Sequence, residues 1–595
     1  MHRVCLFIVF LILSTALFSQ NPREVPSFEE VISLESVSNP KISPDGRDVV
    51  YQLRKTQWKK NGYDTEIWLA REQQTPFQLT NTKDGSSSNP KWSPNGKWIS
   101  FVAKRGDKSQ IHVIRAAGGE AMQVTQMDKN IYGYEWSPDG SQFLFITTDE
   151  NKEKKEAIEK RYGDYAVEDE VFARSQLWII NFEPDSILKT ALPAYMKDTS
   201  KKADLPTWKK PLLVTDSTEF TISDYYWSPD GKSIAIEHQP DAHFLSFMKT
   251  DISILDLDTK AIRPLVTNAG SDKLAGWSPD SKSILFSSYE DDTVANFYKN
   301  DKLFRIDVDG KNQKQLGKDF DEYLRGLKWT EEGIYATGFQ KTNRPLFLIN
   351  PKTGKVKKVP TGIDRVFSFD VTPDGMNIAL AGEKNGELGE IYAGAIDDSN
   401  YQKISNTSNQ IHGWKVAQSE VIQWESEDGA MIEGILHKPL DYDPDKKYPL
   451  MVIIHGGPTG IDRPQPVPGY VYPVLQWLDK GALVLRPNYR GSAGYGEEFR
   501  SLNVENLGVG DAWDVMSGID YLDQKGMIDT SKMGAMGWSQ GGYISAFLTT
   551  TTNSFKAISV GAGISNWVTY YVNTDIHPFT RSEERRVGKE CATGC

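Results

Sequence analysis

The pattern of hydrophobic and polar positions divides the chain into two regions. From residue 27 to residue 408, short apolar runs such as 98–102 and 284–286 alternate with polar turns, which predicts short antiparallel strands. From residue 409 to residue 580, longer apolar runs alternate with segments of helical spacing. That second pattern predicts a parallel sheet covered by helices.

A turn motif recurs through the first region. Ser-Pro-Asp-Gly or a variant of it occurs seven times, once in degraded form, with its Ser or Thr at positions 43, 93, 137, 228, 278, 330 and 372. Proline fixes φ, the Asp side chain bonds its own backbone and glycine accepts a positive φ, so each motif predicts a hairpin. Spacings of 50, 44, 91, 50, 52 and 42 residues lie near the period of four-stranded propeller blades. The repeat therefore predicts a β-propeller of seven blades over residues 27–408.

The interval of 91 residues is about twice the others. Residues 149–170 in it are dense in charge, and residues 176–180 have a strand pattern. We interpret the charged stretch as an insertion into one blade, and an eighth blade is the alternative. Glu168 and Glu170 are a candidate pair for binding the amino terminus of a peptide, although a charge run of this kind usually marks a solvated helical face.

The second region leads up to a serine motif. Gly537-Trp538-Ser539-Gln540-Gly541 matches the Gly-x-Ser-x-Gly nucleophile elbow, a sharp strand-to-helix turn that exposes a serine hydroxyl. A helix N-terminus beneath the serine favours developing negative charge. Ser539 is therefore the candidate nucleophile. The predicted elements are strands at 448–454, 482–485, 532–536 and 557–561, a helix at 511–522 and a helix from residue 542.

His-Gly-Gly-Pro at residues 455–458 directly follows the predicted strand at 448–454. Glycines here expose backbone N–H groups near the nucleophile, as an oxyanion hole requires. We assign the oxyanion hole to the N–H groups of Gly457 and Gln540. His455 precedes the serine on another strand, so we interpret it as a loop anchor, with a role as general base as the alternative.

Composition and motif content limit the partners and cofactors that we expect for this chain. A net charge of −12 argues against nucleic acid, because phosphate binding needs a basic surface. Neither metal-ligand spacing nor a phosphate-binding loop occurs, so we expect no metal and no cofactor. The three cysteines, Cys5, Cys591 and Cys595, lie near the ends, so the body of the chain uses no disulfide.

The N-terminus has the three-part pattern of a secretory signal peptide over residues 1–19. Arg3 precedes an apolar run at 4–13 and small residues at 14–19. We expect an exported protein, periplasmic or secreted, without stable membrane insertion after cleavage. An uncleaved anchor is the alternative, although the apolar run is short for a membrane span.

Together these motifs resemble the prolyl oligopeptidase family (S9) of serine peptidases, as an exported bacterial member close to the acylaminoacyl-peptidase and dipeptidyl-peptidase-like branches. The matching residues are the Ser-Pro-Asp-Gly repeats, residues 455–458, Asn-Tyr-Arg-Gly-Ser-Ala-Gly-Tyr-Gly at 488–496, and residues 537–542. The resemblance implies a propeller that gates an α/β-hydrolase domain, and hydrolysis of short peptides through an acyl-enzyme on Ser539. It implies that Ile564, Trp567 and Tyr570 line the substrate pocket, and it allows an oligomer. His455 stands where the dipeptidyl-peptidase branch has a tyrosine, which favours the acylaminoacyl branch.

The end of the chain departs from the family. α/β-Hydrolases place an acid and then a histidine on two separate loops after the serine. Asp575 and His577 are only two residues apart, so we expect the triad Asp and His to be absent from these 595 residues. Residues 581–595 resemble the translation of a sequencing-library adapter, which predicts a hydrolase domain truncated at residue 580, a non-native tail and an inactive chain. A real basic tail is the alternative.

Two other functions remain open at this stage. An esterase or amidase would use the same nucleophile and oxyanion hole, since one fold hosts many reactions. A propeller that only binds proteins would need neither. The elbow and the His-Gly-Gly-Pro loop favour the enzyme.

Overall fold

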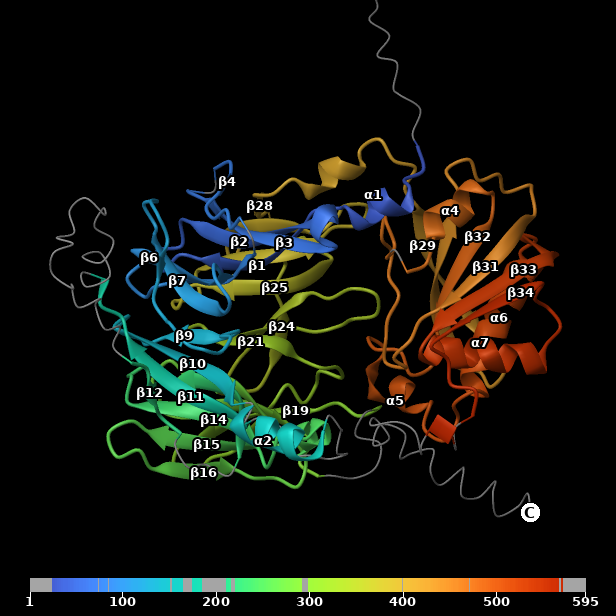
Figure 1. Cartoon of the computed structure of the whole chain (residues 1–595). Helices are drawn as coiled ribbons and strands as arrows, with labels where there is room; N and C mark the ends of the chain where they lie inside the picture. The colour runs from blue at the N-terminus through green and yellow to red at the C-terminus, as the bar shows by residue number, and fades with distance from the viewer. Residues whose placement is uncertain are drawn as a thin grey trace, which may run out of the picture.

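The structure, a computed structural model, describes residues 24–72, 74–83, 85–149, 152–163, 174–184, 210–215, 220–291, 298–398, 400–469, 471–566 and 569–570. These residues form two domains that lie side by side (Figure 1). The first contains seven four-stranded antiparallel sheets and the second one six-stranded mixed sheet. The prediction of a seven-bladed β-propeller followed by an α/β-hydrolase domain is confirmed.

Each propeller sheet takes four strands in sequence order. The first three sheets comprise β1 (Ser36–Ile42), β2 (Val49–Gln57), β3 (Gly62–Ala70) and β4 (Phe77–Gln78); β5 (Ser87–Trp92), β6 (Trp98–Lys104), β7 (Ser109–Arg115) and β8 (Met122–Gln123); and β9 (Tyr134–Trp136), β10 (Gln142–Asp149), β11 (Arg174–Asn181) and β12 (Leu212–Leu213). The fourth and fifth comprise β13 (Thr221–Trp227), β14 (Ser233–Gln239), β15 (Asp251–Asp256) and β16 (Ile262–Val266); and β17 (Asp272–Trp277), β18 (Ser283–Ser288), β19 (Lys302–Asp307) and β20 (Lys314–Leu316). The last two comprise β21 (Arg325–Trp329), β22 (Ile334–Thr337), β23 (Leu346–Ile349) and β24 (Val356–Lys358); and β25 (Arg365–Val371), β26 (Asn377–Glu383), β27 (Glu390–Ala395) and β28 (Gln402–Lys403).

The repeated turns join the first and second strands of the sheets. In the first sheet, the Ser43 hydroxyl donates to Asp45 Oδ1 at 2.6 Å and the Gly46 N–H donates to Ser43 O at 2.9 Å. Gly46 has a φ of +75°, which glycine adopts without strain. Ser281, at the matching position of the fifth sheet, takes a φ of +60° although it has a side chain. The turn geometry thus follows from the motif's own side chains.

The ring closes where the first sheet packs against the seventh. Val37 and Tyr51 of the first sheet share a buried cluster with Ala379, Ala381 and Ala393 of the seventh. Equivalent clusters fill each of the six other gaps between neighbouring sheets. Burial of apolar surface between sheets therefore holds all the blades together.

The long interval belongs to a single blade. Its sheet has the order β12-β11-β10-β9, and α2 (Lys152–Tyr162) lies between β10 and β11. The insertion is therefore confirmed, and the alternative of an eighth blade is wrong. A second long connection, between β11 and β12, was not predicted. Glu168 and Glu170 lie outside the described residues.

The six-stranded sheet has the order β29-β30-β32-β31-β33-β34. The first two strands pair antiparallel and the last four pair parallel. Predicted strand 448–454 coincides with β31, whereas β33 extends beyond the predicted 532–536 at both ends. The strands are β29 (Gln418–Glu425), β30 (Met431–Lys438), β31 (Tyr448–Ile454), β32 (Leu483–Asn488), β33 (Ile528–Trp538) and β34 (Ala557–Gly561).

Helices cover this sheet and connect its parallel strands (Figure 1). α6 and α7 pack on a core of strand residues that includes Val452, Leu485 and Ala535. Helix α7 starts at Gln540 rather than at the predicted residue 542, directly after the turn. The helices are α4 (Val474–Asp479), α5 (Gly496–Ser501), α6 (Gly510–Gln524) and α7 (Gln540–Thr551), and α1 (Phe28–Ile32) precedes the propeller. The short 3₁₀ helices are Trp58–Lys60, Phe244–Met248 and Thr407–Ile411.

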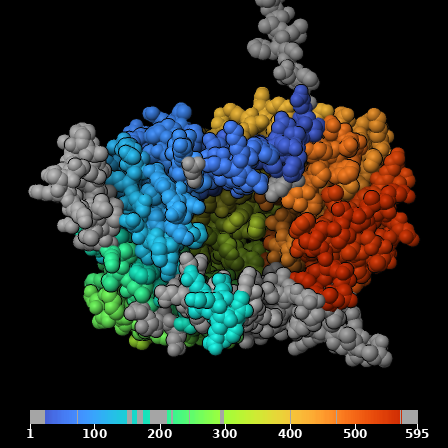
Figure 2. Space-filling model, viewed as in Figure 1, coloured from blue at the N-terminus to red at the C-terminus, as the bar shows by residue number. Residues whose placement is uncertain are grey.

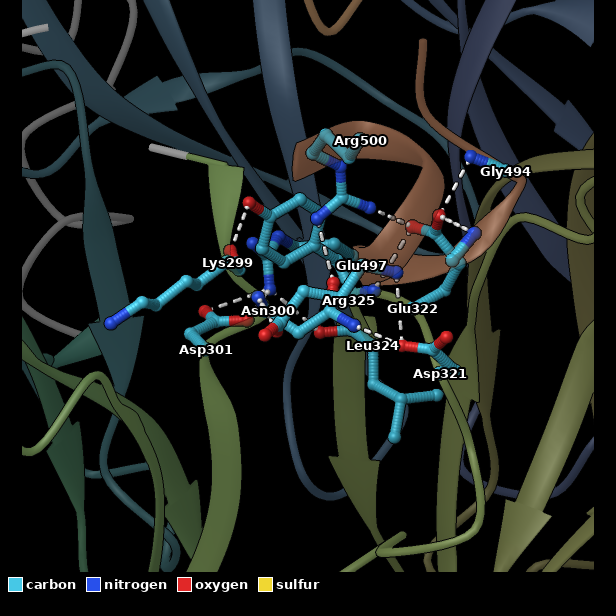
Figure 3. Close-up of polar contacts among 12 residues, drawn as sticks. Lys299, Asn300, Asp301, Asp321, Glu322, Leu324, Arg325, Gly494, Glu497 and Arg500 are labelled. Carbon is cyan, nitrogen blue, oxygen red and sulfur yellow. Dashed lines mark hydrogen bonds and ion pairs between the residues drawn. The ribbon is translucent and has the colours of Figure 1, made fainter. Parts of the chain in front are cut away.

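One buried carboxylate ties the propeller to the second domain (Figure 3). Glu322, between β20 and β21, accepts the N–H of Gly494 at 2.7 Å and that of Gly496 at 3.2 Å. Its other oxygen accepts from Arg500 of α5 at 2.7 Å. A Cβ on Gly494 would lie 2.5 Å from the carbonyl oxygen of Lys341. The Asn-Tyr-Arg-Gly-Ser-Ala-Gly-Tyr-Gly segment therefore serves as a docking loop for the propeller.

Replacing Glu322 by glutamine is expected to destabilise the protein by about 3–5 kcal/mol, because it leaves the buried Arg500 guanidinium without its counter-charge. Thermal unfolding of the variant measures this loss. Glu290→Gln is the matched control, since its ion pair with Lys302 is solvent-exposed and such pairs contribute about 0–1 kcal/mol. Equal shifts for the two variants would contradict the assigned role of Glu322.

Candidate active site

The candidate nucleophile lies on the turn between a strand and a helix. β33 ends at Trp538, α7 begins at Gln540, and Ser539 between them has φ +58° and ψ −121°. Such a conformation is strained for a residue with a side chain and persists only where its surroundings fix it. The Ser539 N–H donates to Gly561 O at 3.0 Å, and the Tyr543 N–H donates to Ser539 O at 2.9 Å. The turn thus holds Ser539 in place and leaves it exposed.

The two glycines of the motif permit this turn. A Cβ on Gly537 would lie 2.2 Å from the carbonyl oxygen of Gly541, and a Cβ on Gly541 would lie 2.0 Å from the carbonyl oxygen of Ile454. Both contacts are with backbone, which cannot move aside as a flexible side chain can. The strand, the turn and the start of α7 can approach each other only because both positions are glycine.

The His-Gly-Gly-Pro loop lies against the serine. A Cβ on Gly456 would lie 3.0 Å from Ser539 Cβ and 3.7 Å from Ser539 Oγ. Gly457 has a φ of +140°, and a Cβ there would lie 2.4 Å from the Gly460 nitrogen. The backbone at Gly457 therefore has a path that only glycine can follow.

Two N–H groups, one on the residue that follows Ser539 and one in the His-Gly-Gly-Pro loop, are free to donate. Within the described part of the chain, neither the N–H of Gly457 nor that of Gln540 donates a hydrogen bond. Gln540 is the first residue of α7, where helix N–H groups have no partner within the helix. Free donors near an exposed hydroxyl are what a developing oxyanion needs.

His455 is held by its neighbours rather than by the serine. Its Nε2 lies 3.0 Å from the Ser492 hydroxyl, and its Nδ1 lies 2.8 Å from Gly456 O. The ring stacks on Tyr489, whose hydroxyl donates to His455 O at 3.0 Å. Burial lowers the pKa of His455, which favours the neutral ring. These contacts are those of a loop anchor.

The described residues show no base for Ser539. In this part of the chain no histidine hydrogen-bonds its hydroxyl, and no group of three or more His, Cys, Asp or Glu residues could hold a metal ion. None of the helices in the described ranges is long and apolar enough to cross a membrane. Residues 1–19, Asp575, His577 and residues 581–595 lie outside those ranges.

Family models match both domains. Residues 19–167 match the TolB beta propeller domain, and residues 470–591 match the prolyl oligopeptidase family. The chain carries a prolyl oligopeptidase domain.

Relatives of known name cover nearly the whole chain. An uncharacterized peptidase, YuxL, of Bacillus subtilis is 25% identical over 93% of this chain and 84% of its own length. Dipeptidyl-peptidase 5 of Porphyromonas gingivalis is 25% identical over 92% of this chain and 80% of its own length. The solved Pyrococcus horikoshii acylaminoacyl peptidase shares the fold, with a TM-score of 0.72, 21% identity, and coverage of 93% of this chain and 81% of that one.

A buried carboxyl lies beside the side chain of Gln540, one of the two predicted oxyanion-hole residues. Gln540 Nε2 donates to Asp511 Oδ2 at 3.3 Å, and Asp511 Oδ1 has no hydrogen-bond partner among the described residues. Burial, and secondarily the neighbouring Asp514, raises the pKa of Asp511 to about 7. Asp511 therefore takes up a proton near neutral pH while its other oxygen holds the side chain of Gln540.

The raised pKa of Asp511 predicts a pH-dependent stability. The unfolded carboxyl titrates near 3.8 and the folded one near 7, so the folded state binds more protons between these values. Stability should therefore fall as pH rises from about 4 to 7, by on the order of a few kcal/mol relative to Asp511→Asn. Thermal unfolding of both proteins from pH 5 to pH 8 measures the difference.

The partly exposed Asp529 supplies the control for this titration, because hydrogen bonds from Ser531 and Lys532 hold its pKa at about 2, below the pH range of the experiment. Asp529→Asn should track the wild type at every pH. Parallel pH curves for wild type and Asp511→Asn would contradict the assigned titration.

The structure describes two of the three predicted pocket residues of the prolyl oligopeptidase domain. Ile564 and Tyr570 are both half-buried in the segment after β34, whereas Trp567 lies outside the described residues. That segment starts beside the nucleophile, because Gly561 O accepts from the Ser539 N–H and a Cβ on Gly542 would lie 2.3 Å from Gly561 O. A pocket lined by Ile564, Trp567 and Tyr570 stays a prediction.

Sequence reasoning did not find the residues that support this site. The helical pattern places Asp511 only at the start of a helix. No local sequence pattern marks Glu322 as a residue that docks the propeller on the second domain. Both act on partners far away in sequence, at separations of 29 and 172 or more residues. The Ser492 partner of His455 lies inside the quoted family motif, which was the one available hint.

Proposed function

We propose that the protein is a serine peptidase that cleaves short peptides through an acyl-enzyme on Ser539. The proposal rests mainly on the strained turn at Ser539, where the side chain is exposed and the next residue, Gln540, has an unbonded N–H; the N–H of Gly457, in the loop that lies against the serine, is also unbonded. The match to the prolyl oligopeptidase family supports peptides as the substrate class. The relatives' names, which include dipeptidyl and acylaminoacyl peptidases, support the same class.

In this proposal the Ser539 hydroxyl attacks the carbonyl carbon of the scissile bond and gives its proton to a general base. The N–H groups of Gly457 and Gln540 donate to the oxyanion, and the positive end of α7 adds to this stabilisation. The amine then leaves with a proton from the base, and water hydrolyses the remaining ester. His455 does not serve as this base, because its two ring nitrogens face Ser492 and Gly456.

The propeller's place in the molecule supports a gating role. Figure 2 shows a hollow between the two domains, with propeller atoms at its back. We propose that this arrangement favours short peptides over folded proteins, which are too bulky to enter. The signal-like pattern of residues 1–19 supports export, to the periplasm or beyond.

A substrate panel tests the proposal. The protein, expressed from its gene to the natural stop codon, is assayed with chromogenic dipeptides, N-acetylated peptides and short-chain esters. We expect turnover of at least one peptide class, with preference between free and acetylated amino termini identifying the branch. Ester hydrolysis without any peptide cleavage would make the protein an esterase. A folded protein inert to the whole panel would leave a propeller that binds without catalysis.

A further inference from the structure

Four arginines gather where the propeller meets the loop that carries the proposed oxyanion hole. Arg325 begins β21, Arg365 begins β25, and Arg344 lies between β22 and β23. Arg463, in the second domain, lies five residues after the end of the His-Gly-Gly-Pro loop. We call these four residues the arginine cluster.

The members of the cluster lie close to one another. Arg365 Nε and Arg463 Nε both donate to Oε1 of Glu383, the latter at 3.4 Å. Burial first, and then the charges of Arg325 and Arg463, lower the pKa of Arg344. The backbones of Arg344 and Arg365 form a bridge, with Val366 N–H donating to Arg344 O at 2.8 Å. The cluster is therefore one site built by both domains.

The carboxylates of the chain do not neutralise this cluster. Asp301 and Glu383 are the only carboxylates among the described residues that form hydrogen bonds or ion pairs with the four guanidinium groups. Two neutral groups also accept, Asn385 Oδ1 from Arg365 at 3.3 Å and Leu324 O from Arg325 at 3.1 Å. Two carboxylates in direct contact thus face four guanidinium groups; the charge of Asp462 also acts on Arg463, but Asp462 is already paired with Arg486. Arginine stays protonated at any ordinary pH, so the excess charge cannot be lost by deprotonation.

Two of the arginines keep unused donors. The Arg344 guanidinium is half-buried and has no hydrogen bond or ion pair in the described part of the chain; it lies over the Phe339 ring, 5.5 Å from the ring centroid. Arg365 is 1% exposed, and its Nη2 has no partner there. An unpaired, partly desolvated cation is unfavourable by itself, so an anion from outside the chain would stabilise the site.

The location suits a ligand that also reaches Ser539. Arg463 is seven residues from Gly456, which lies against Ser539, so the two backbone positions are at most about 25 Å apart. Three of the arginines come from the sixth and seventh sheets of the propeller, the domain whose atoms form the back of the hollow in Figure 2. A peptide in this hollow would have a carboxylate as its anionic group.

We propose that the arginine cluster binds a carboxylate of the peptide substrate, either its C-terminal carboxylate or an acidic side chain, in a charge-assisted and partly bidentate manner. The proposal rests on the proposed peptidase function for its ligand class. Substrates with a carboxylate at the right distance from the cleaved bond would be held by the propeller while the second domain cleaves them.

Binding measurements on Ser539→Ala protein test the site without turnover. Isothermal titration uses an N-acetylated tetra-alanine as the free acid, the same peptide as its amide, and an amide with one alanine replaced by glutamate. We expect the free acid, the glutamate peptide or both to bind at least about tenfold more tightly than the neutral amide. Tighter binding of the free acid alone would identify the C-terminal carboxylate as the ligand. Tighter binding of the glutamate peptide would identify an acidic side chain.

Arg344→Met should remove this preference, whereas Arg47→Met, which removes an exposed arginine from a distant propeller turn, should leave it intact. Because the Arg344 guanidinium has no hydrogen bond or ion pair in the described residues, and methionine keeps an apolar side chain beside Phe339, its loss should not lower the melting temperature. Arg344→Lys keeps the charge but not the planar fork, and should weaken the preference severalfold. Equal binding of all three peptides, or full preference in Arg344→Met, would overturn the proposal.

Fluorophosphonate labelling of the wild type separates the two claims. Carboxylate preference without labelling of Ser539 would sink the peptidase proposal and leave the arginine cluster as a binding site. Labelling of Ser539 without any carboxylate preference would support the peptidase proposal and overturn the arginine cluster as a carboxylate-binding site.

Discussion

Replacing Ser539 by alanine is expected to lower kcat/KM for peptide hydrolysis by at least about ten-thousandfold. The hydroxyl is the atom that forms the ester, and without it only the oxyanion donors and substrate binding remain. Ser539 is exposed, so its replacement should leave stability nearly unchanged. Steady-state kinetics with the best peptide of the panel measure the loss, and thermal unfolding checks that the variant is folded.

Ser531→Ala is the matched control for this loss, because Ser531 is also exposed and lies on the same strand, β33. Its kcat/KM should equal that of the wild type. A Ser539→Ala enzyme that keeps a tenth of the activity would assign the nucleophile to another residue.

Gly541→Ala is expected to destabilise the second domain by about 3 kcal/mol or more and to abolish activity. The added methyl would lie 2.0 Å from Ile454 O and 2.7 Å from His455 O. Both atoms belong to backbone that β31 and its loop fix, so the start of α7 would have to move away from the sheet. That movement would carry the N–H of Gln540 away from the oxyanion position. Thermal unfolding and kcat/KM are both measured.

The control for this substitution is Gly469→Ala. A Cβ at Gly469 would meet nothing within 4 Å, and the residue is exposed in a loop of the same domain. Its stability should lie within about 0.5 kcal/mol of the wild type. If Gly541→Ala were as stable and active as Gly469→Ala, the close approach of strand, loop and helix would not be what positions Ser539.

The propeller could be predicted from sequence because its signal is local and repeated. Each Ser-Pro-Asp-Gly turn contains the side chains that form its own hydrogen bonds, as Ser43 and Asp45 show. Seven copies at a regular spacing then determine the blade count. The long third blade was harder, since only one of its two extra connections had a charge pattern that marked it.

The second domain was predictable in outline for a different reason. Buried parallel strands are continuous apolar runs, and β31 matched its predicted range at both ends. The start of α7 was placed two residues late, at 542, because the serine turn leads into the helix without a spacer. The antiparallel pair β29 and β30 was not predicted. β30 is buried along most of its length, as the parallel strands are, so its burial pattern does not mark it as antiparallel.

In the candidate site too, the local motifs could be predicted from sequence and the contacts between distant segments could not. Ser539, Gly457 and Gln540 could be named as candidates because glycine spacing encodes a backbone path that the neighbouring chain must follow, and their catalytic roles stay predictions. The supporting groups were not, since Asp511, Glu322 and the arginine cluster act through contacts between distant segments. A single sequence shows that such residues exist but not which of them meet.

The central claim is that Ser539 is the nucleophile, and covalent labelling tests it most directly. The protein expressed from its gene is treated with a fluorophosphonate, digested, and analysed by mass spectrometry. The account predicts one adduct, on the peptide that contains Ser539, and no adduct in Ser539→Ala. Stoichiometric labelling at a different serine, or a folded protein that takes up no probe, would contradict it.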